Sequence, residues 1–165
     1  MDLTTSLIGL GMIASLIILF VAMKISNNNK EKKKFQEISK IASRQNSKIS
    51  QLDSSGNFII GIDENTNFLF FLKKDDNTET DQAVNLSEIQ SCRIINSGNS
   101  INNKNGNYHV INKLALSFSP IIKGKLDIEF EFYNSETDTY TLSGEIQLLE
   151  KWKGIINNKL KKIKA

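Results

Sequence analysis

The chain has 165 residues, 39% of them hydrophobic, 24% charged, with a formal net charge of +3. This length allows one modest domain with accessory segments. The excess of basic over acidic residues lies outside the body: residues 24–50 carry eight basic and two acidic side chains, whereas residues 51–158 carry nine basic and fifteen acidic ones. A nucleic-acid-binding domain would have a basic folded surface, so this distribution argues against that class.

The first element is an uncharged stretch from Leu3 to Met23, bounded by Asp2 and Lys24. As a helix it spans about 30 Å, the thickness of the bilayer core. The alternative, a cleaved signal peptide, needs a positive start and a small-x-small cleavage pattern, which are missing here. We predict a transmembrane anchor over residues 1–24. The small residues within it also allow helix pairing, and thus a homo-oligomer.

Basic residues follow the apolar stretch directly: Lys24, Lys30, Lys32, Lys33 and Lys34. By the positive-inside rule they place the N-terminus outside and the C-terminal domain in the cytoplasm, at the inner (plasma) membrane. The single cysteine, Cys92, agrees with a reducing compartment. We expect these lysines to contact anionic lipid head groups, although a topology signal on a solvated helix is an alternative role.

Residues 25–52 form a predicted stalk. Apolar residues at heptad spacing, from Phe35 through Ile38 and Ala42 to Ile49 and Leu52, predict an amphipathic helix over residues 30–52. It either docks on the domain or pairs as a short coiled coil.

From residue 53 the apolar period changes to two, which predicts six or seven antiparallel strands. Residues 58–62 and 68–72 form a predicted hairpin, residues 84–89 and 91–95 two short strands, and residues 108–118 and 126–132 two more. In the last of these Leu126 is expected on the core face. The segments 75–81 and 97–107 are expected to be loops.

The last element is a predicted amphipathic helix from Glu145 onward, with Ser143 as its cap. Trp152 is expected to be buried and to anchor this helix. The fold class is thus α+β, with the domain over residues 53–165.

The order of elements resembles the pleckstrin-homology-like (PH-like) superfold, in particular bacterial membrane-anchored PH-like domains. The residues that carry the resemblance are 61–64 leading into 68–71, then 84–89, and the ending 148–152. The resemblance implies an antiparallel barrel or sandwich closed by the C-terminal helix, and a binding role toward lipid head groups or proteins. The lipid-binding members place Lys and Arg in the first hairpin, where this chain has Asp63 and Glu64.

Catalytic and metal-binding patterns are weak. His109 and Cys92 are the only histidine and cysteine, so the chain offers few ligands for a zinc site and only one possible pair for a Cys–His nucleophile. The spacing Asp63-x-Asn65-x-Asn67 imitates a calcium loop but lacks its glycine and its final glutamate. An acidic cluster comprises Asp75, Asp76, Glu79 and Asp81. We expect no enzyme activity and no cofactor.

The sequence therefore predicts a membrane-anchored cytoplasmic binding or adaptor module, with an unknown protein partner and without nucleic acid. The alternatives are lipid or hydrophobic-ligand binding at the membrane surface, and a small antagonist of the immunity-protein type.

Overall fold

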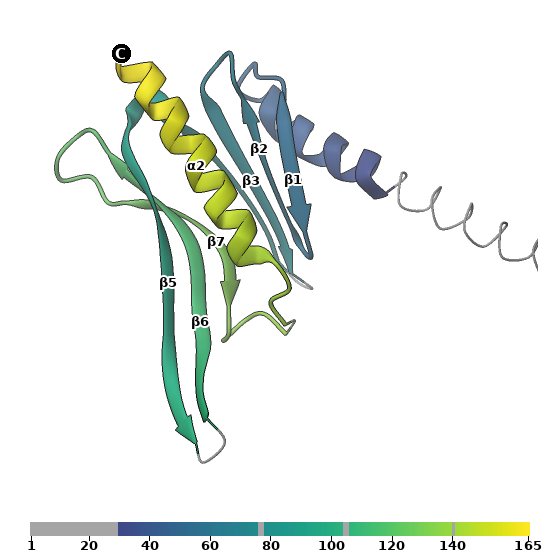
Figure 1. Ribbon diagram of the computed structural model, residues 1–165. Coiled ribbons are helices and arrows are strands. Elements are labelled where there is room, and N and C mark those ends of the chain that lie inside the picture. Colours follow the sequence, from purple (N-terminus) through teal and green to yellow (C-terminus); the bar gives the residue numbers. More distant parts are fainter. Residues whose placement is uncertain (1–29, 76–77, 104–105, 140) are drawn as a thin grey trace, which may run out of the picture. The chain divides into compact units, whose positions relative to one another are not determined.

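A computed structural model describes residues 30–75, 78–103, 106–139 and 141–165 (Figure 1). The chain divides into two compact units, Met1–Glu37 and Ile38–Ala165. The predicted anchor and Lys24 lie outside the described residues, so the anchor stays a prediction. Among the helices described, none is both long enough and apolar enough to cross a membrane.

The second unit is built from two antiparallel sheets and a C-terminal helix, which confirms the α+β class. The first sheet has the order β1-β2-β3-β4 and the second the order β5-β6-β7. The 3-10 turn η1 (Leu86–Glu88) connects the sheets, and α2 (Glu145–Lys164) follows the last strand. The strands are β1 (Gln51–Ser55), β2 (Phe58–Asp63), β3 (Phe68–Asp75), β4 (Thr78–Asn85), β5 (Ile89–Asn103), β6 (Gly106–Pro120) and β7 (Ile128–Asn134).

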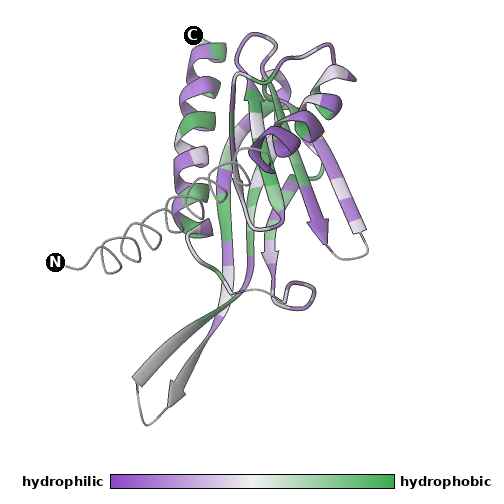
Figure 2. Cartoon of the chain, turned by 90° about the vertical axis from the view of Figure 1, so that its right-hand side faces the viewer, coloured by the Kyte–Doolittle hydropathy of each residue, from purple (hydrophilic) through white to green (hydrophobic). Residues whose placement is uncertain are grey.

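The main core lies between the sheets and α2. Alternating residues of β2, β3 and β7 point into it, because successive side chains of a strand face opposite sides. Phe71 stacks on Phe130 with ring centroids 5.0 Å apart, and Phe58 meets Phe132 edge-on at 4.6 Å. The helix seals this core with a stripe of fully or almost fully buried residues, namely Leu149, Trp152, Ile156 and Leu160. Figure 2 shows apolar and polar segments alternating along the strands and α2.

A second apolar cluster covers the other face of β2 and β3. Ile59, Phe70 and Leu72 pack there against Ile38 and Ala42 of the helix over residues 30–43. Both faces of these strands are therefore buried. This explains why the predicted hairpin, which the structure confirms, is apolar at nearly every position.

The predicted helix over residues 30–52 ends at residue 43, so that prediction was wrong beyond this point. Three backbone-bonded turn residues follow, and Asn46 adopts a left-handed φ of 52°, which stops the helix. Ile49 and Leu52 still pack on the second cluster, Leu52 from β1. The heptad pattern therefore predicted the buried positions but not their secondary structure.

Several strand boundaries also differ from the prediction. The predicted loop over residues 97–107 belongs to β5 and β6, which pair as far as Asn103 and Gly106. The acidic segment 75–81 is likewise the paired ends of β3 and β4 around residues 76–77, which are not described. The predicted strand 84–89 contains η1, because the Asn85 Oδ1 atom accepts a hydrogen bond from the Ser87 N–H at 3.0 Å.

The start of α2 differs as well. Its N-cap is Gly144, with a φ of 119°, and not Ser143. No side chain caps the helix, and the Glu145 carboxylate instead accepts from the Ser143 N–H before the helix and, at 2.9 Å, from the Ser55 hydroxyl. This ties the first turn of the helix to β1.

Candidate functional site

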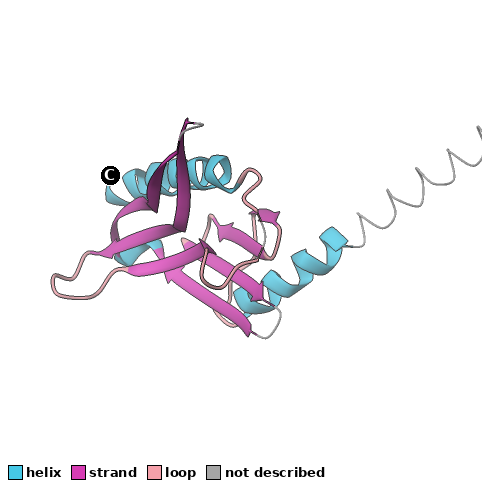
Figure 3. Cartoon of the chain, turned by 90° about the horizontal axis from the view of Figure 1, so that it is seen from below, coloured by secondary structure: helices cyan, strands magenta, loops and turns pink. Residues whose placement is uncertain are grey.

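Helix α2 caps part of the outer edge of β5 with side-chain hydrogen bonds to the strand backbone. Helix α2 lies against β5 (Figures 1 and 3). The Asn157 carboxamide donates to the Cys92 carbonyl at 3.0 Å and accepts from the Cys92 N–H at 3.4 Å. A residue of a neighbouring strand would make the same two bonds. The Lys164 ammonium donates to the Gln90 carbonyl at 2.5 Å.

Beyond Cys92 the described residues leave the outer edge of β5 without a backbone partner. In an antiparallel pair, residues whose backbone groups bond the partner strand alternate with residues whose groups point away from it. Since the Cys92 groups point toward α2, those of Ile94 and Asn96 also point away from β6, up to the register shift after Ser97. Strand β5 is an edge strand of its sheet. Within the described part of the chain, no backbone partner takes these outward groups of Ile94 and Asn96.

Another edge strand, β4 of the first sheet, is protected by charge. Glu79 lies 3.4 Å from the Lys74 ammonium, and Asp81 accepts from Arg44 at 2.5 Å. Charged side chains on an edge strand discourage pairing with another chain. The β5 edge over residues 94–97 carries Ile, Ile, Asn and Ser, with no charge of its own. Of these two edges, β5 is therefore the better suited to receive an extended segment.

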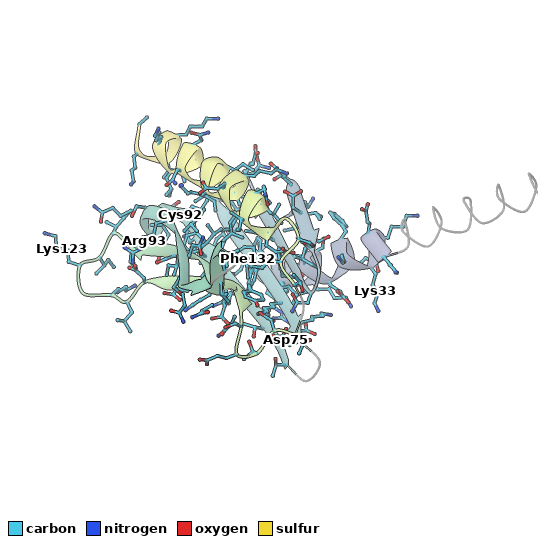
Figure 4. All side chains as sticks on the ribbon, turned by 60° about the horizontal axis from the view of Figure 1, so that its bottom comes forward. Lys33, Asp75, Cys92, Arg93, Lys123 and Phe132 are labelled. Atoms are coloured by element: carbon cyan, nitrogen blue, oxygen red, sulfur yellow. The ribbon has the colours of Figure 1, made fainter. Side chains whose placement is uncertain are left out.

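The predicted membrane-contact lysines lie on the helix over residues 30–43, apart from Lys24. Lys30, Lys32 and Lys33 are exposed and Lys34 is half-buried (Figure 4 labels Lys33). Contact with lipid head groups requires such exposure.

Trp152 is fully buried, as predicted for the residue that anchors the helix. Its indole N–H donates to the Asp53 Oδ2 atom at 2.9 Å, and the Lys151 ammonium reaches the same oxygen at 2.6 Å. Trp152 therefore fixes α2 both by packing and by a polar contact to β1. This position gives it a structural role.

The structure does not assemble a Cys92–His109 pair. Cys92 lies opposite Phe118 and His109 opposite Ser100, eight residues further along β5, which is roughly 25 Å of strand. Cys92 is 5% exposed, and this burial, opposed only by the positive charge of Lys153, raises the pKa of its thiol to about 12. A thiol with that pKa is not an activated nucleophile.

The calcium-like spacing is a hairpin turn. The Asp63 carboxylate accepts the backbone N–H groups of Lys48, Asn65 and Thr66 at 2.7–3.3 Å. Burial alone would raise the pKa of Asp63, but the hydrogen bonds from Lys48, Asn65 and Thr66 outweigh it, so the pKa is lowered. The carboxylate stabilises the turn between β2 and β3 and also the segment entering β1.

The acidic cluster is dispersed over paired strands, and Asp76 lies outside the described residues. No group of three or more His, Cys, Asp or Glu side chains placed to hold a metal ion occurs in residues 30–75, 78–103, 106–139 and 141–165. Asp75, labelled in Figure 4, instead belongs to a buried polar cluster that sequence reasoning missed. There the Lys73 ammonium lies 2.8 Å from the Asp138 Oδ2 atom and 3.9 Å from Asp75.

The chain matches no protein-family model, no curated protein and no solved structure. Shared sequence therefore assigns no family, and the resemblance to PH-like domains remains a prediction. The candidate site accordingly depends on the geometry of the β5 edge: two residues capped by α2 and two residues with outward backbone groups.

Proposed function

We propose that this protein is a non-enzymatic binding module that holds an extended segment of a protein partner on the β5 edge, at the cytoplasmic face of the membrane. The observation that carries the proposal is the partial cap on β5. The Asn157 carboxamide bonds the backbone N–H and carbonyl of Cys92, while the outward backbone groups of Ile94 and Asn96 have no backbone partner among the described residues.

Addition of a strand to a sheet edge is a common mode of peptide recognition. The backbone bonds supply affinity and the neighbouring side chains supply selectivity. Each backbone hydrogen bond contributes about 0.5–1.5 kcal/mol net, so Ile94 and Asn96 alone support a weak, reversible contact. The acidic body, with fifteen acidic and nine basic side chains over residues 51–158, favours a basic segment.

The predicted anchor makes such a weak contact sufficient for binding. A module held at the membrane by residues 3–23 meets other membrane-bound proteins at a raised effective concentration. Affinity that is too weak in solution is then sufficient. The exposed lysines that follow the anchor support the cytoplasmic orientation.

The order of four strands, three strands and a C-terminal helix supports the likeness to PH-like domains, which bind proteins or lipid head groups. The turn between β2 and β3 carries Asp63 and Glu64, whose charge is unfavourable for a phosphorylated head group. A superfold hosts many functions, so the β5 edge and not the likeness selects a protein partner.

Proline at position 96 tests the proposal. Proline removes a backbone N–H, and at Asn96 that N–H points away from β6, so the ladder between β5 and β6 is retained. Asn96→Ala is the matched control, because it removes the side chain and keeps the N–H. The full-length protein is crosslinked in its native membrane, purified, and its partners are identified by mass spectrometry.

We expect the wild type and Asn96→Ala to recover the same stoichiometric protein, and Asn96→Pro to recover about two- to twelve-fold less, the factor that corresponds to one lost backbone hydrogen bond. Equal thermal midpoints of the variants check folding. Hydrogen exchange of the wild type gives a second reading: the amides of Ile94 and Asn96 gain protection when the recovered partner is added. The proposal fails if no partner is recovered, or if those amides stay unprotected in the complex.

A further inference from the structure

The loop between β6 and β7 exposes apolar side chains that a solvated loop does not need. Ile121 is 52% exposed, Ile122 58% and Leu126 91%. Leu126 was expected in the core, but β7 begins two residues later, at Ile128. Contiguous exposed apolar side chains mark interaction surfaces.

The base of the loop is fixed on both sides. The Ile121 N–H donates to the Glu88 carbonyl at 2.8 Å. The Asp127 Oδ2 atom accepts from Arg93 at 2.8 Å, from Ser117 at 3.1 Å and from Ser119 at 3.2 Å. The apolar side chains are therefore presented by an anchored loop.

The tip of the loop is a tight turn with a lysine on either side of its glycine. Gly124 has a φ of 90°, and the Lys125 N–H donates to the Ile122 carbonyl at 3.4 Å. Lys123 and Lys125 are exposed, and in the described part of the chain neither pairs with a carboxylate. Figure 4 shows Lys123 at the outer end of this loop.

The basic end of α2 lies at the same end of the domain. The Lys164 ammonium donates to the Gln90 carbonyl, and the preceding residue, Ile89, is paired with Pro120 at the start of the loop. Figures 1 and 3 both show the C-terminus and the loop at this end. The exposed lysines at this end are Lys123 and Lys125 of the loop and Lys161, Lys162 and Lys164 of the last turn of α2, while the body as a whole is acidic. The Lys159 ammonium instead donates to the Glu64 carbonyl in the turn between β2 and β3, at 2.6 Å.

We infer that this end of the domain, the loop over residues 121–126 with the last turns of α2, docks on an anionic phospholipid bilayer. Apolar side chains interleaved with lysines suit the bilayer interface: Ile121, Ile122 and Leu126 enter the boundary with the acyl chains, and the ammonium groups remain among the phosphates. An apolar groove of a protein would not call for lysines between the inserted residues. The surface is separate from residues 94–96, so it stands or falls independently of the proposed function.

A fluorescent probe at position 122 tests the docking. The full-length Ile122→Cys variant is labelled with an environment-sensitive nitrobenzoxadiazole maleimide. Cys92 does not compete, because it is buried and its thiol has a pKa of about 12. The protein is mixed with vesicles of phosphatidylcholine alone, or with phosphatidylglycerol added, each with and without doxyl-labelled lipid. Glu136→Cys, at an exposed turn after β7, is the matched control position.

We expect the probe at 122 to shift to the blue and to be quenched by doxyl lipid in the anionic vesicles, more than in neutral ones. The probe at 136 should respond to neither. Lys123→Gln with Lys125→Gln should reduce the ratio of docked to undocked loop by roughly 25-fold, since each basic residue near an anionic surface contributes about five-fold. Insertion of the predicted anchor is common to both vesicle types and does not produce this difference.

Two results would overturn the inference. A probe at 122 that stays in a polar environment with both vesicles shows a solvated loop. A blue shift without quenching by doxyl lipid shows that the loop is covered by protein, either a partner or a second copy of the chain.

Discussion

The buried ion pair between Lys73 and Asp138 gives a sharp prediction about stability. The Asp138 side chain has no accessible surface, and its Oδ2 atom accepts from the Lys73 ammonium at 2.8 Å and from the Asn134 N–H at 2.7 Å. The pair fastens the turn after β7 to the end of β3. Asp138→Asn should therefore leave a buried ammonium without its closest counter-charge.

The size of the effect follows from what remains around Lys73. Removal of one member of a buried pair costs about 3–5 kcal/mol. Asp75, at 3.9 Å, is a second carboxylate that compensates in part. Burial raises the pKa of Asp75, as does the like charge of Asp138, so Asp75 should ionise more easily in the variant. We therefore expect the lower end, about 3 kcal/mol.

Urea unfolding measures the loss, with the fluorescence of Trp152 as the reporter, since it is the chain's single tryptophan and is buried. A double variant separates the pair from its setting. Lys73→Met with Asp138→Leu removes both charges, and its free energy of unfolding should be at most about 1 kcal/mol below that of the wild type, or above it. An Asp138→Asn variant that loses less than about 0.5 kcal/mol would refute the reasoning, as would a double variant less stable than that single variant.

Three further predictions concern other parts of the domain. Trp152→Ala should lower the free energy of unfolding by about 3–5 kcal/mol, measured by urea unfolding followed by circular dichroism. Trp152→Phe loses mainly the hydrogen bond to Asp53 and should lower it by about 1–2 kcal/mol. Equal losses in the two variants would mean that packing of the ring is unimportant. Gly61→Ala should be tolerated, because its Cβ would meet flexible methyl ends such as Ile38 Cδ1 at 3.2 Å, but Gly61→Val should cost about 1–3 kcal/mol by the same assay. The ionised Asp63 carboxylate stabilises the folded state, because its pKa there is lowered from the ordinary value of 3.8. This stability is present above pH 3.8 and is lost as the pH falls through the folded-state pKa, so between about pH 5 and about pH 2 the wild type should lose more stability than Asp63→Asn. Parallel losses of stability in the two proteins would contradict this.

The apolar strands were predictable, and those made of polar residues were not. Residues 58–62 and 68–72 are rich in β-branched and aromatic side chains, which predict strands. The Asn- and Ser-rich end of β5 and the acidic β4 have weak intrinsic preference for a strand. They are strands because β6 and β3 supply a ladder of partners along them. Such pairing across the chain overrides local propensity and leaves no local pattern.

The candidate sites were harder to predict for the same reason. Asn157 reads as a polar position on a helix, and only its distance to Cys92, 65 residues away, gives it a role at the sheet edge. Leu126 continued the alternation of β7 and was expected in the core, yet it is 91% exposed because the strand begins two residues later. A strand that begins two residues earlier keeps the same alternation of core and solvent positions. The alternation alone therefore cannot tell whether a residue such as Leu126 is in the strand or in the loop before it.

Helix α2 contacts both proposed surfaces, and this decides how they have to be tested. Asn157 holds the β5 edge at Cys92, and Lys164 holds Gln90 next to the loop, so displacement of the helix would disturb both together. Neither Asn96→Pro nor the Lys123→Gln and Lys125→Gln pair alters a described contact of α2. Each should therefore remove one activity alone. If the lysine variant also abolished partner recovery, bilayer docking would orient the β5 edge toward membrane-bound partners, and the two surfaces would act as one.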